Sequence, residues 1–158
     1  DLNDLGVIGQ RVPLLDNEKC RGCKKCQVES SCPIKAARLE DGKLVVGADC
    51  NNCGRCKGKC PFGVIPEYTD GYKVCIGGRW GKKVATGRPL DKIFTSEDEV
   101  MDVIERAILF FRDEGISGER FADTVSRLGF EYVQDKLINS KIDKSAVLNK
   151  TVKGGATC

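Results

Sequence analysis

Eight of the ten cysteines form two sets with similar spacing. In each set, two residues separate the first three cysteines, and a fourth cysteine stands directly before a proline. Four thiolates bind one [4Fe–4S] cluster, and in two-cluster bacterial proteins the fourth thiolate comes from the other set. The spacing therefore predicts two [4Fe–4S] clusters. The predicted ligands are Cys20, Cys23, Cys26 and Cys60 for one cluster, and Cys50, Cys53, Cys56 and Cys32 for the other.

Gaps of two residues let the chain wrap around one corner of a cluster while backbone N–H groups point at its sulfur atoms. Gly22 and Gly54 lie inside these turns and allow the backbone to approach closely. The two sets differ in one respect, because five residues separate Cys26 from Cys32, whereas three separate Cys56 from Cys60. We expect the longer segment to form a loop that bulges outward without removing a ligand.

Two other uses of cysteine fit the pattern less well. A zinc module uses two Cys-x-x-Cys pairs for each ion rather than triplets with a distant Cys-Pro. A disulfide framework suits a short secreted chain, and no signal peptide precedes these cysteines. Eight thiolates committed to iron–sulfur chemistry imply a reducing compartment, so we expect a cytoplasmic protein. The absence of histidine removes the most common general acid and base.

The charge and the apolar pattern exclude some classes of protein. No run approaches the ~20 apolar residues of a membrane span. Lysine and arginine outnumber the acidic residues at positions 17–63, whereas acidic residues prevail at positions 91–144. Basic charge beside a cluster attracts acidic donor proteins, and the alternative interpretation of these cations is ordinary solvated surface. A regulatory or nucleic-acid-binding module is disfavoured, since no recognition motif is present and aromatic residues do not interleave with the cations.

The periodicity predicts few elements around the cysteines and more after them. Leu5–Ile8 is typical of a strand, and Asp41-Gly42 predicts a hairpin between residues 37–39 and 44–46. Short helices beside the cysteines are also expected. After residue 68 a strand carrying Val74 and Ile76 ends at Gly77-Gly78. Ser96 and Glu99 form the signature of a capping box, which predicts a helix over 96–114.

This helix has one apolar stripe at helical spacing. The stripe comprises Val100, Val103, Ile104, Ala107, Ile108 and Phe111. A second helix begins at Ser117 and a shorter one covers 130–139, whereas residues 141–158 lose periodicity and are expected to be disordered. Cys158 is not expected to be a cluster ligand.

A glycine-rich basic loop follows the strand that ends at Gly77. Such loops bind anions, because bare backbone N–H groups and cations converge there, although a hairpin turn with solvated cations has the same composition. Cys75 is expected to be a buried, inert thiol, and Trp80 to fill the core, with stacking on a cofactor as the alternative. The candidate anion-binding residues are Arg79, Lys82, Lys83 and Arg88.

The order of these segments resembles the C-terminal part of the siroheme-dependent sulfite and nitrite reductases, in the anaerobic and dissimilatory branch with an inserted ferredoxin domain. The resemblance rests on the two cysteine sets, on VCIGGRWGKKVATGRPL and on GERFADTVSRLG, and it spans residues 2–138. LNDLGVIGQ resembles the strand that follows the siroheme cluster motif. The resemblance implies an α+β chain in which a two-[4Fe–4S] ferredoxin-like domain is inserted into a partial α/β siroheme-reductase half-domain.

The implied domains are an entering strand at 1–16, a ferredoxin domain at 17–68, a returning strand with helices at 69–140, and a tail at 141–158. The family also holds a siroheme and a third [4Fe–4S] cluster through a further four-cysteine motif, which this sequence lacks. The resemblance therefore implies a fragment that is not catalytically competent by itself and has no catalytic residue.

The expected function is to relay single electrons from an external donor protein or subunit, through two clusters, to the siroheme domain of the parent reductase. The basic loop would face the siroheme or an anion. The alternative is a stand-alone two-[4Fe–4S] carrier with an added helical domain. The residues after position 70 discriminate between these hypotheses, because a carrier has no need of the basic loop and helix pair.

Overall fold

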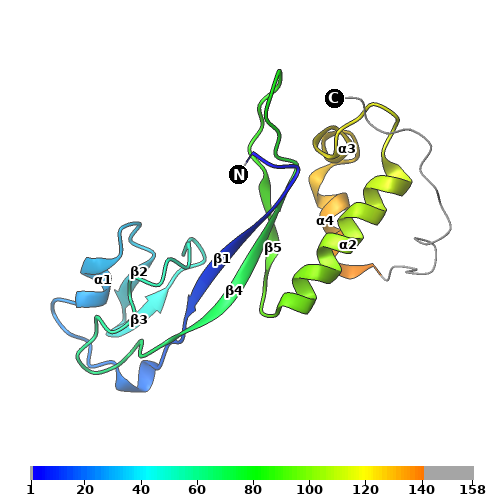
Figure 1. Cartoon of the computed structure of the whole chain (residues 1–158). Coiled ribbons are helices and arrows are strands. Elements are labelled where there is room, and N and C mark those ends of the chain that lie inside the picture. The colour runs from blue at the N-terminus through cyan, green and yellow to red at the C-terminus, as the bar shows by residue number, and fades with distance from the viewer. Residues whose placement is uncertain (1, 141–158) are drawn as a thin grey trace. The chain divides into compact units, whose positions relative to one another are not determined.

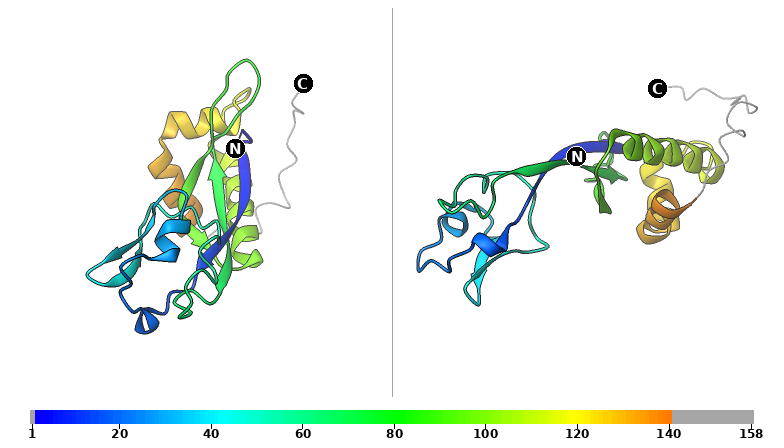
Figure 2. Two further views of the ribbon diagram at one scale, coloured as in Figure 1. Left: turned by 90° about the vertical axis from the view of Figure 1, so that its left-hand side faces the viewer. Right: turned by 90° about the horizontal axis from the view of Figure 1, so that it is seen from below.

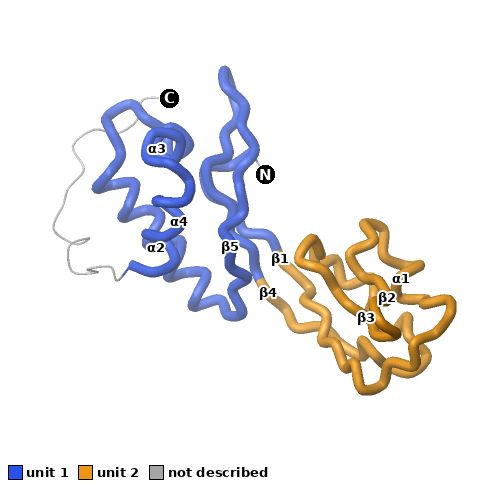
Figure 3. The backbone as a smooth tube through the Cα atoms, turned by 180° about the vertical axis from the view of Figure 1, so that it is seen from behind, with its two compact units in different colours: residues 1–8, 72–158 blue, residues 9–71 orange. Residues whose placement is uncertain are grey.

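Two long strands, β1 (Leu5–Pro13) and β4 (Tyr68–Ile76), cross the boundary between two compact units. The computed structural model describes residues 2–140. Unit 1 comprises residues 2–8 and 72–140 of this range, and unit 2 comprises residues 9–71 (Figure 3). Unit 2 thus interrupts unit 1 in the sequence, with limits slightly wider than the 17–68 expected for a ferredoxin domain.

The hairpin of unit 2 has the predicted turn. β2 (Ala37–Glu40) pairs antiparallel with β3 (Lys43–Val46), and Glu40 lies opposite Lys43 (Figure 1). Asp41 and Gly42 join the strands with φ angles of 48° and 75°. A two-residue turn with both φ angles positive matches the twist of its flanking strands, which explains why Asp-Gly predicts it.

The segment between Cys26 and Cys32 is helical, and the expectation of an outward loop was wrong. α1 covers Gln27–Ser31, and a single 3-10 turn, η1, covers Asn17–Lys19. Val28 points inward and is 1% exposed in a small core that contains Leu44, Val64 and Ile65. The segment forms a helix because one apolar side chain finds a buried position in the small core of unit 2.

The sheet has the strand order β1-β4-β5. β5 (Arg88–Phe94) pairs antiparallel with β4, so that Tyr72 lies opposite Phe94, and the register shifts between Lys73 and Cys75. The sequence patterns predicted β1 only as far as Ile8 and did not predict β5. Pro89 interrupts the apolar alternation of β5, and proline is tolerated there because β5 is an edge strand.

Three helices complete unit 1 and pack against its sheet (Figures 1 and 2). They are α2 (Glu97–Glu114), α3 (Phe121–Leu128) and α4 (Phe130–Asn139). The core residues are Val74, Ile76, Leu90, Phe94, Val100, Val103, Ala107, Phe121, Val125, Val133 and Leu137. None of the described helices combines the length and apolar character of a membrane-spanning segment.

The boundaries of α2 and most of its apolar stripe match the prediction. Ser96 is the N-cap, and its side chain accepts a hydrogen bond from the Glu99 backbone N–H. The Glu99 carboxylate bonds to the backbone N–H of Thr95 at 2.9 Å instead of returning to Ser96. Ile108 was wrongly placed in the core, since it is 63% exposed at the edge of the stripe. The predictions for 141–158 and Cys158 lie outside the described residues.

Candidate iron–sulfur centres

One pocket of unit 2 contains thiols from both cysteine sets. Cys50, Cys53 and Cys56 of the second set line it together with Cys32, the fourth cysteine of the first set. These are the four residues that the sequence pattern assigns to one cluster. Non-polar groups form much of the remaining wall, among them Pro13, Pro33, Ile34, Ala37 and Val46.

The electrostatics of Cys56 reflect the proximity of these sulfur atoms. Burial raises the pKa of the Cys56 thiol, and the negative charges of Cys50, Cys53 and Cys32 raise the pKa further. Like charges disfavour one another's ionised forms when they lie close together. Four thiolates in this pocket therefore require a positively charged partner, and the iron atoms of a cluster would supply that charge.

Cys32 has a different environment, rich in hydrogen-bond donors. Burial acts to raise the pKa of its thiol, but backbone N–H groups outweigh that effect and lower the pKa. Lys35 contributes to this arrangement with a φ of 56°. Successive N–H groups that converge on one atom form an anion-binding concavity, which suits a thiolate ligand. The donors belong to Ala37, Ile34, Ala36 and Lys35.

The remaining four cysteines are less enclosed. Cys20, Cys26 and Cys60 are half-buried and pack against the small core of unit 2, whereas Cys23 is exposed. Cys20 Sγ lies 3.8 Å from the carbonyl oxygen of Gly42 in the hairpin turn. Within residues 2–140, no three His, Cys, Asp or Glu side chains form a group that could hold a metal ion. The assignment of all eight cysteines to two clusters stays a prediction.

Strand β1 holds the second cysteine set in place. The Arg11 backbone N–H donates to the Asn52 carbonyl oxygen at 2.8 Å, and Arg11 forms a parallel bridge with Cys53. Asn52 and Gln10 are both buried, and the Asn52 side-chain amide donates to Gln10 Oε1 at 3.4 Å. Sequence reasoning missed Arg11, Gln10 and Asn52, because only the fold brings β1 beside the Cys50–Cys53 loop.

The structure separates the four cations of the basic loop. Arg79 forms an ion pair with Asp123, and its side chain is largely buried. The backbone N–H of Arg120 chiefly lowers the pKa of Asp123, and Arg79 and Lys83 lower the pKa further. These contacts hold the Arg79 guanidinium against α3.

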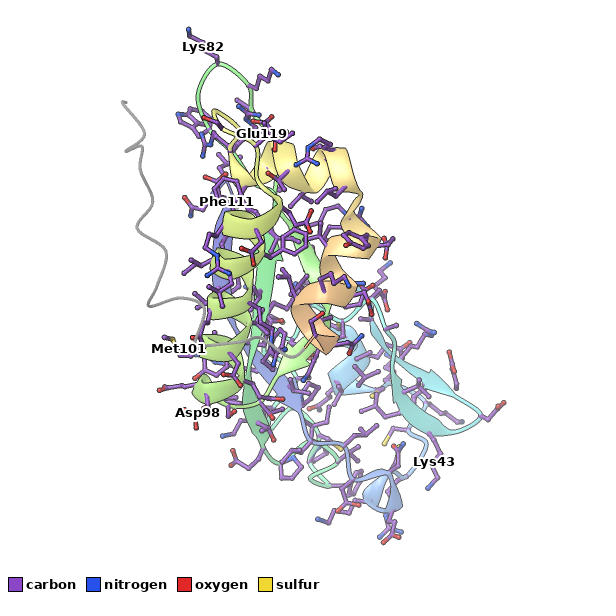
Figure 4. The ribbon with its side chains drawn as sticks, turned by 90° about the vertical axis from the view of Figure 1, so that its right-hand side faces the viewer. Lys43, Lys82, Asp98, Met101, Phe111 and Glu119 are labelled. Atoms are coloured by element: carbon purple, nitrogen blue, oxygen red, sulfur yellow. The ribbon has the colours of Figure 1, made fainter. Side chains whose placement is uncertain are left out.

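Arg88 is also engaged within unit 1. Its guanidinium carbon lies 3.8 Å from the centre of the Phe130 ring, and Nη2 lies 3.3 Å from Glu131 Oε1. Lys82 and Lys83 remain exposed in the segment that joins β4 to β5, and Lys82 projects at the tip of this hairpin (Figure 4). An anion could therefore meet the lysines of this loop more readily than its arginines.

The two remaining predictions for this region had different outcomes. Cys75 is buried at 4% exposure, as expected. Trp80 was wrongly expected in the core, because its side chain is 67% exposed. The residue lies beyond the end of β4, where the bridge between Arg79 and Ala85 extends the hairpin past the packed part of the sheet.

Residues 1–145 match the nitrite and sulphite reductase 4Fe-4S domain. The chain belongs to this family. It is 27% identical over 82% of its length to the coenzyme F420-dependent sulfite reductase of Methanocaldococcus jannaschii. Over 65% of its length it is 29% identical to the dissimilatory-type sulfite reductase subunit alpha of Allochromatium vinosum. It spans 21% and 27% of those relatives.

The fold is also that of this family. The crystal structure of dissimilatory sulfite reductase I superimposes with a TM-score of 0.52 and 22% identity, over 99% of this chain and 42% of that one. An uncharacterized ferredoxin of M. jannaschii is 33% identical over 64% of both chains. The chain is therefore an iron–sulfur domain of the sulfite and nitrite reductase family, as its sequence motifs indicated.

Proposed function

We propose that this chain relays single electrons through two [4Fe–4S] clusters to the siroheme site of a sulfite or nitrite reductase. The observation that carries the proposal is the pocket shared by Cys32 and the triplet Cys50, Cys53 and Cys56. A ligand set drawn from both halves of unit 2 is what interlocked clusters require. The second cluster would be held by Cys20, Cys23, Cys26 and Cys60.

The residues around the pocket would hold and tune a cluster. Each cluster, when bound, accepts and releases one electron at a time. The N–H groups around Cys32 stabilise negative charge on its sulfur, as does the Asn52 N–H, which lies 3.4 Å from Cys50 Sγ. Hydrogen bonds to cluster sulfur atoms are among the factors that set the reduction potential. Buried Gln10 and Asn52 fix the loop that presents Cys50 and Cys53.

The siroheme and its own cluster would be bound by residues outside this sequence, which has no third four-cysteine set. Lys82 and Lys83 are exposed cations of the basic loop that would meet the siroheme carboxylates or an anionic substrate. Arg79 and Arg88 would support the loop through Asp123 and Glu131. Cationic groups of this kind stabilise anionic ligands and developing negative charge.

Chemical analysis tests the cluster count. Anaerobic reconstitution should give about eight iron and eight acid-labile sulfide per chain, since each cluster contains four of each. Reduction with dithionite should yield an EPR spectrum of two interacting [4Fe–4S]⁺ centres. Content near four of each, with the spectrum of one isolated centre, would contradict a two-cluster relay.

A stand-alone carrier is the second candidate, and the similarity to a ferredoxin over 64% of both chains favours it. The two functions differ in their need for a siroheme partner. The relay hypothesis expects the full-length protein to contain siroheme, detected by its absorbance after purification. The carrier hypothesis expects none, together with exchange of electrons between soluble partners.

A further inference from the structure

We propose that the exposed cations around Cys23 are the docking surface for an acidic electron-donor protein, so that electrons enter at the first cluster. This inference rests on the proposed function, because it names the partner chemistry and the entry point of the same relay. The surface, called the Cys23 face below, consists of Arg21, Lys24 and Lys25 with the Cys23 thiol among them.

The Cys23 face combines positive charge with an accessible ligand. All four residues are exposed. Within the described part of the chain, no hydrogen bond or ion pair engages the side chains of Arg21, Lys24 or Lys25. Their charge is therefore not neutralised by a described carboxylate. An exposed ligand sulfur also marks the edge at which another protein can approach a cluster most closely.

The second triplet also has an exposed cysteine, Cys53, but its surroundings are occupied. Arg11 of β1 bridges to Cys53. The Arg11 side chain packs so near Gly54 that a Cβ there would lie 2.8 Å from Arg11 Cδ. Lys57 is paired with Glu67 at 2.5 Å, and its Nζ lies 4.9 Å from the centre of the Tyr68 ring. Arg11 and Lys57 are thus engaged internally, and among the described residues the exposed cations without such partners beside this triplet are Arg55 and Lys59, against three on the Cys23 face.

The first triplet packs differently, against its own hairpin. Gly22 has a φ of 62°, and a Cβ there would meet the carbonyl oxygen of Gly42 at 3.0 Å. Lys43 Nζ donates to the carbonyl oxygens of Asn17 at 3.1 Å and Cys20 at 3.5 Å, so β3 supports the start of the same triplet from within unit 2. These contacts fix the backbone around Cys23 and leave its cations in solvent.

A protein with an acidic surface is the partner that this face fits. Complementary charge raises association rates by about 10- to 10³-fold, and the gain falls as salt screens the interaction. Nucleic acid also binds cationic surfaces through its phosphates, but it cannot donate electrons to a cluster. Binding of nucleic acid to the Cys23 face is therefore the competing outcome of the test.

The experiment compares two matched charge reversals in the cluster-loaded chain, Lys24→Glu/Lys25→Glu beside the first cluster and Arg55→Glu/Lys57→Glu beside Cys56 of the second. Each pair is exposed, flanks a cluster cysteine and changes the charge equally. Stopped-flow absorbance measures reduction by a reduced clostridial-type ferredoxin, the acidic probe, at low and high ionic strength. The Lys24/Lys25 variant should react roughly 10-fold more slowly at low salt and lose most of its salt dependence, whereas the control should change less than about 3-fold.

Equal slowing of both variants, or no slowing of either, would overturn the docking surface. Binding of a fluorescent oligonucleotide, lost in the Lys24/Lys25 variant while ferredoxin kinetics stay normal, would also overturn it. Iron content and reduction by dithionite separate this failure from failure of the relay itself. If both clusters assemble and accept electrons from dithionite, the proposed function survives even when the docking surface does not.

Discussion

The backbone N–H of Arg11 donates a 2.8 Å hydrogen bond to the carbonyl oxygen of Asn52, so a residue of β1 fixes the loop between Cys50 and Cys53. Leu14 and Asp16 extend this contact further along the chain, donating to Glu67 and Val64 at 3.0 Å and 2.8 Å. The entering chain therefore forms part of the frame that holds the second cysteine triplet, although β1 contains no cysteine.

Gly54→Ala should weaken this frame. Gly54 has a φ of 74°, and the new Cβ would lie 2.8 Å from Arg11 Cδ. Gly58→Ala is the matched control, because its φ is 67° but no atom lies within 4 Å of the added Cβ. Both variants incur the left-handed backbone cost of about 1–2 kcal/mol, and only Gly54→Ala adds the steric conflict. Faster loss of visible cluster absorbance on heating in Gly54→Ala than in Gly58→Ala would confirm the contact, and equal rates would contradict it.

Val28→Ala should destabilise unit 2, since α1 buries Val28 at 1% exposure. Removing two methyl groups and leaving a cavity costs about 2 kcal/mol. Glu29→Ala in the same helix is exposed and should change stability by less than about 0.5 kcal/mol. Denaturant unfolding under anaerobic conditions compares the two. An equal effect of both variants would mean that the 27–31 segment does not pack inward.

Trp80→Ala should leave stability within about 0.5 kcal/mol of the wild type, because the side chain is 67% exposed. Phe94→Ala, at a residue that is 1% exposed in the core of unit 1, should cost about 3–5 kcal/mol. Acrylamide should also quench the fluorescence of Trp80 in the folded protein about as efficiently as in the unfolded chain. Weaker quenching in the folded protein than in the unfolded chain would contradict the exposed position of Trp80.

Glu99 makes the stability of unit 1 sensitive to acid. The backbone N–H of Thr95, followed by the Lys92 side chain, lowers the Glu99 pKa from 4.5 to about 2. The folded state thus binds fewer protons at this site than the unfolded state does. The stabilisation is complete above pH 4.5 and is lost as the pH falls toward about 2.

Glu99→Gln tests this linkage. The variant should be less stable than the wild type at neutral pH, and the difference should shrink as the pH falls through the window from 4.5 to about 2. Urea unfolding followed by helix circular dichroism measures it. Glu97→Gln, an exposed change in the first turn of the same helix, is the control. A constant difference between Glu99→Gln and the wild type at every pH would rule out the proposed titration.

Local signals predicted the elements that depend on local interactions. Asp41-Gly42 predicted its hairpin because the turn needs two positive φ angles, and Ser96 with Glu99 predicted the start of α2. Trp80 was misplaced because residue type alone does not tell whether a turn lies over a core or beyond it. β5 was missed for a related reason, since an edge strand with Pro89 has too little apolar alternation to be read from sequence.

In the candidate site, too, the sequence predicted the features that depend on local spacing and missed those that depend on the fold. The spacing of the cysteines predicted that Cys32 belongs with Cys50, Cys53 and Cys56, and these four residues line one pocket. The contributions of Arg11, Gln10 and Asn52 could not be predicted, since they depend on β1 lying beside a loop about forty residues further along the sequence.

The measurement that tests the central claim most directly is the iron content of two double variants, Cys32→Ser/Cys50→Ser and Cys50→Ser/Cys60→Ser. If the clusters share ligands between the two sets, Cys32 and Cys50 bind the same cluster, and their double variant should retain about four iron per chain with the EPR spectrum of one isolated centre. The Cys50/Cys60 variant should then retain almost none. The reverse result, with about four iron in the Cys50/Cys60 variant and almost none in the Cys32/Cys50 variant, would show that each set binds its own cluster and would contradict the account.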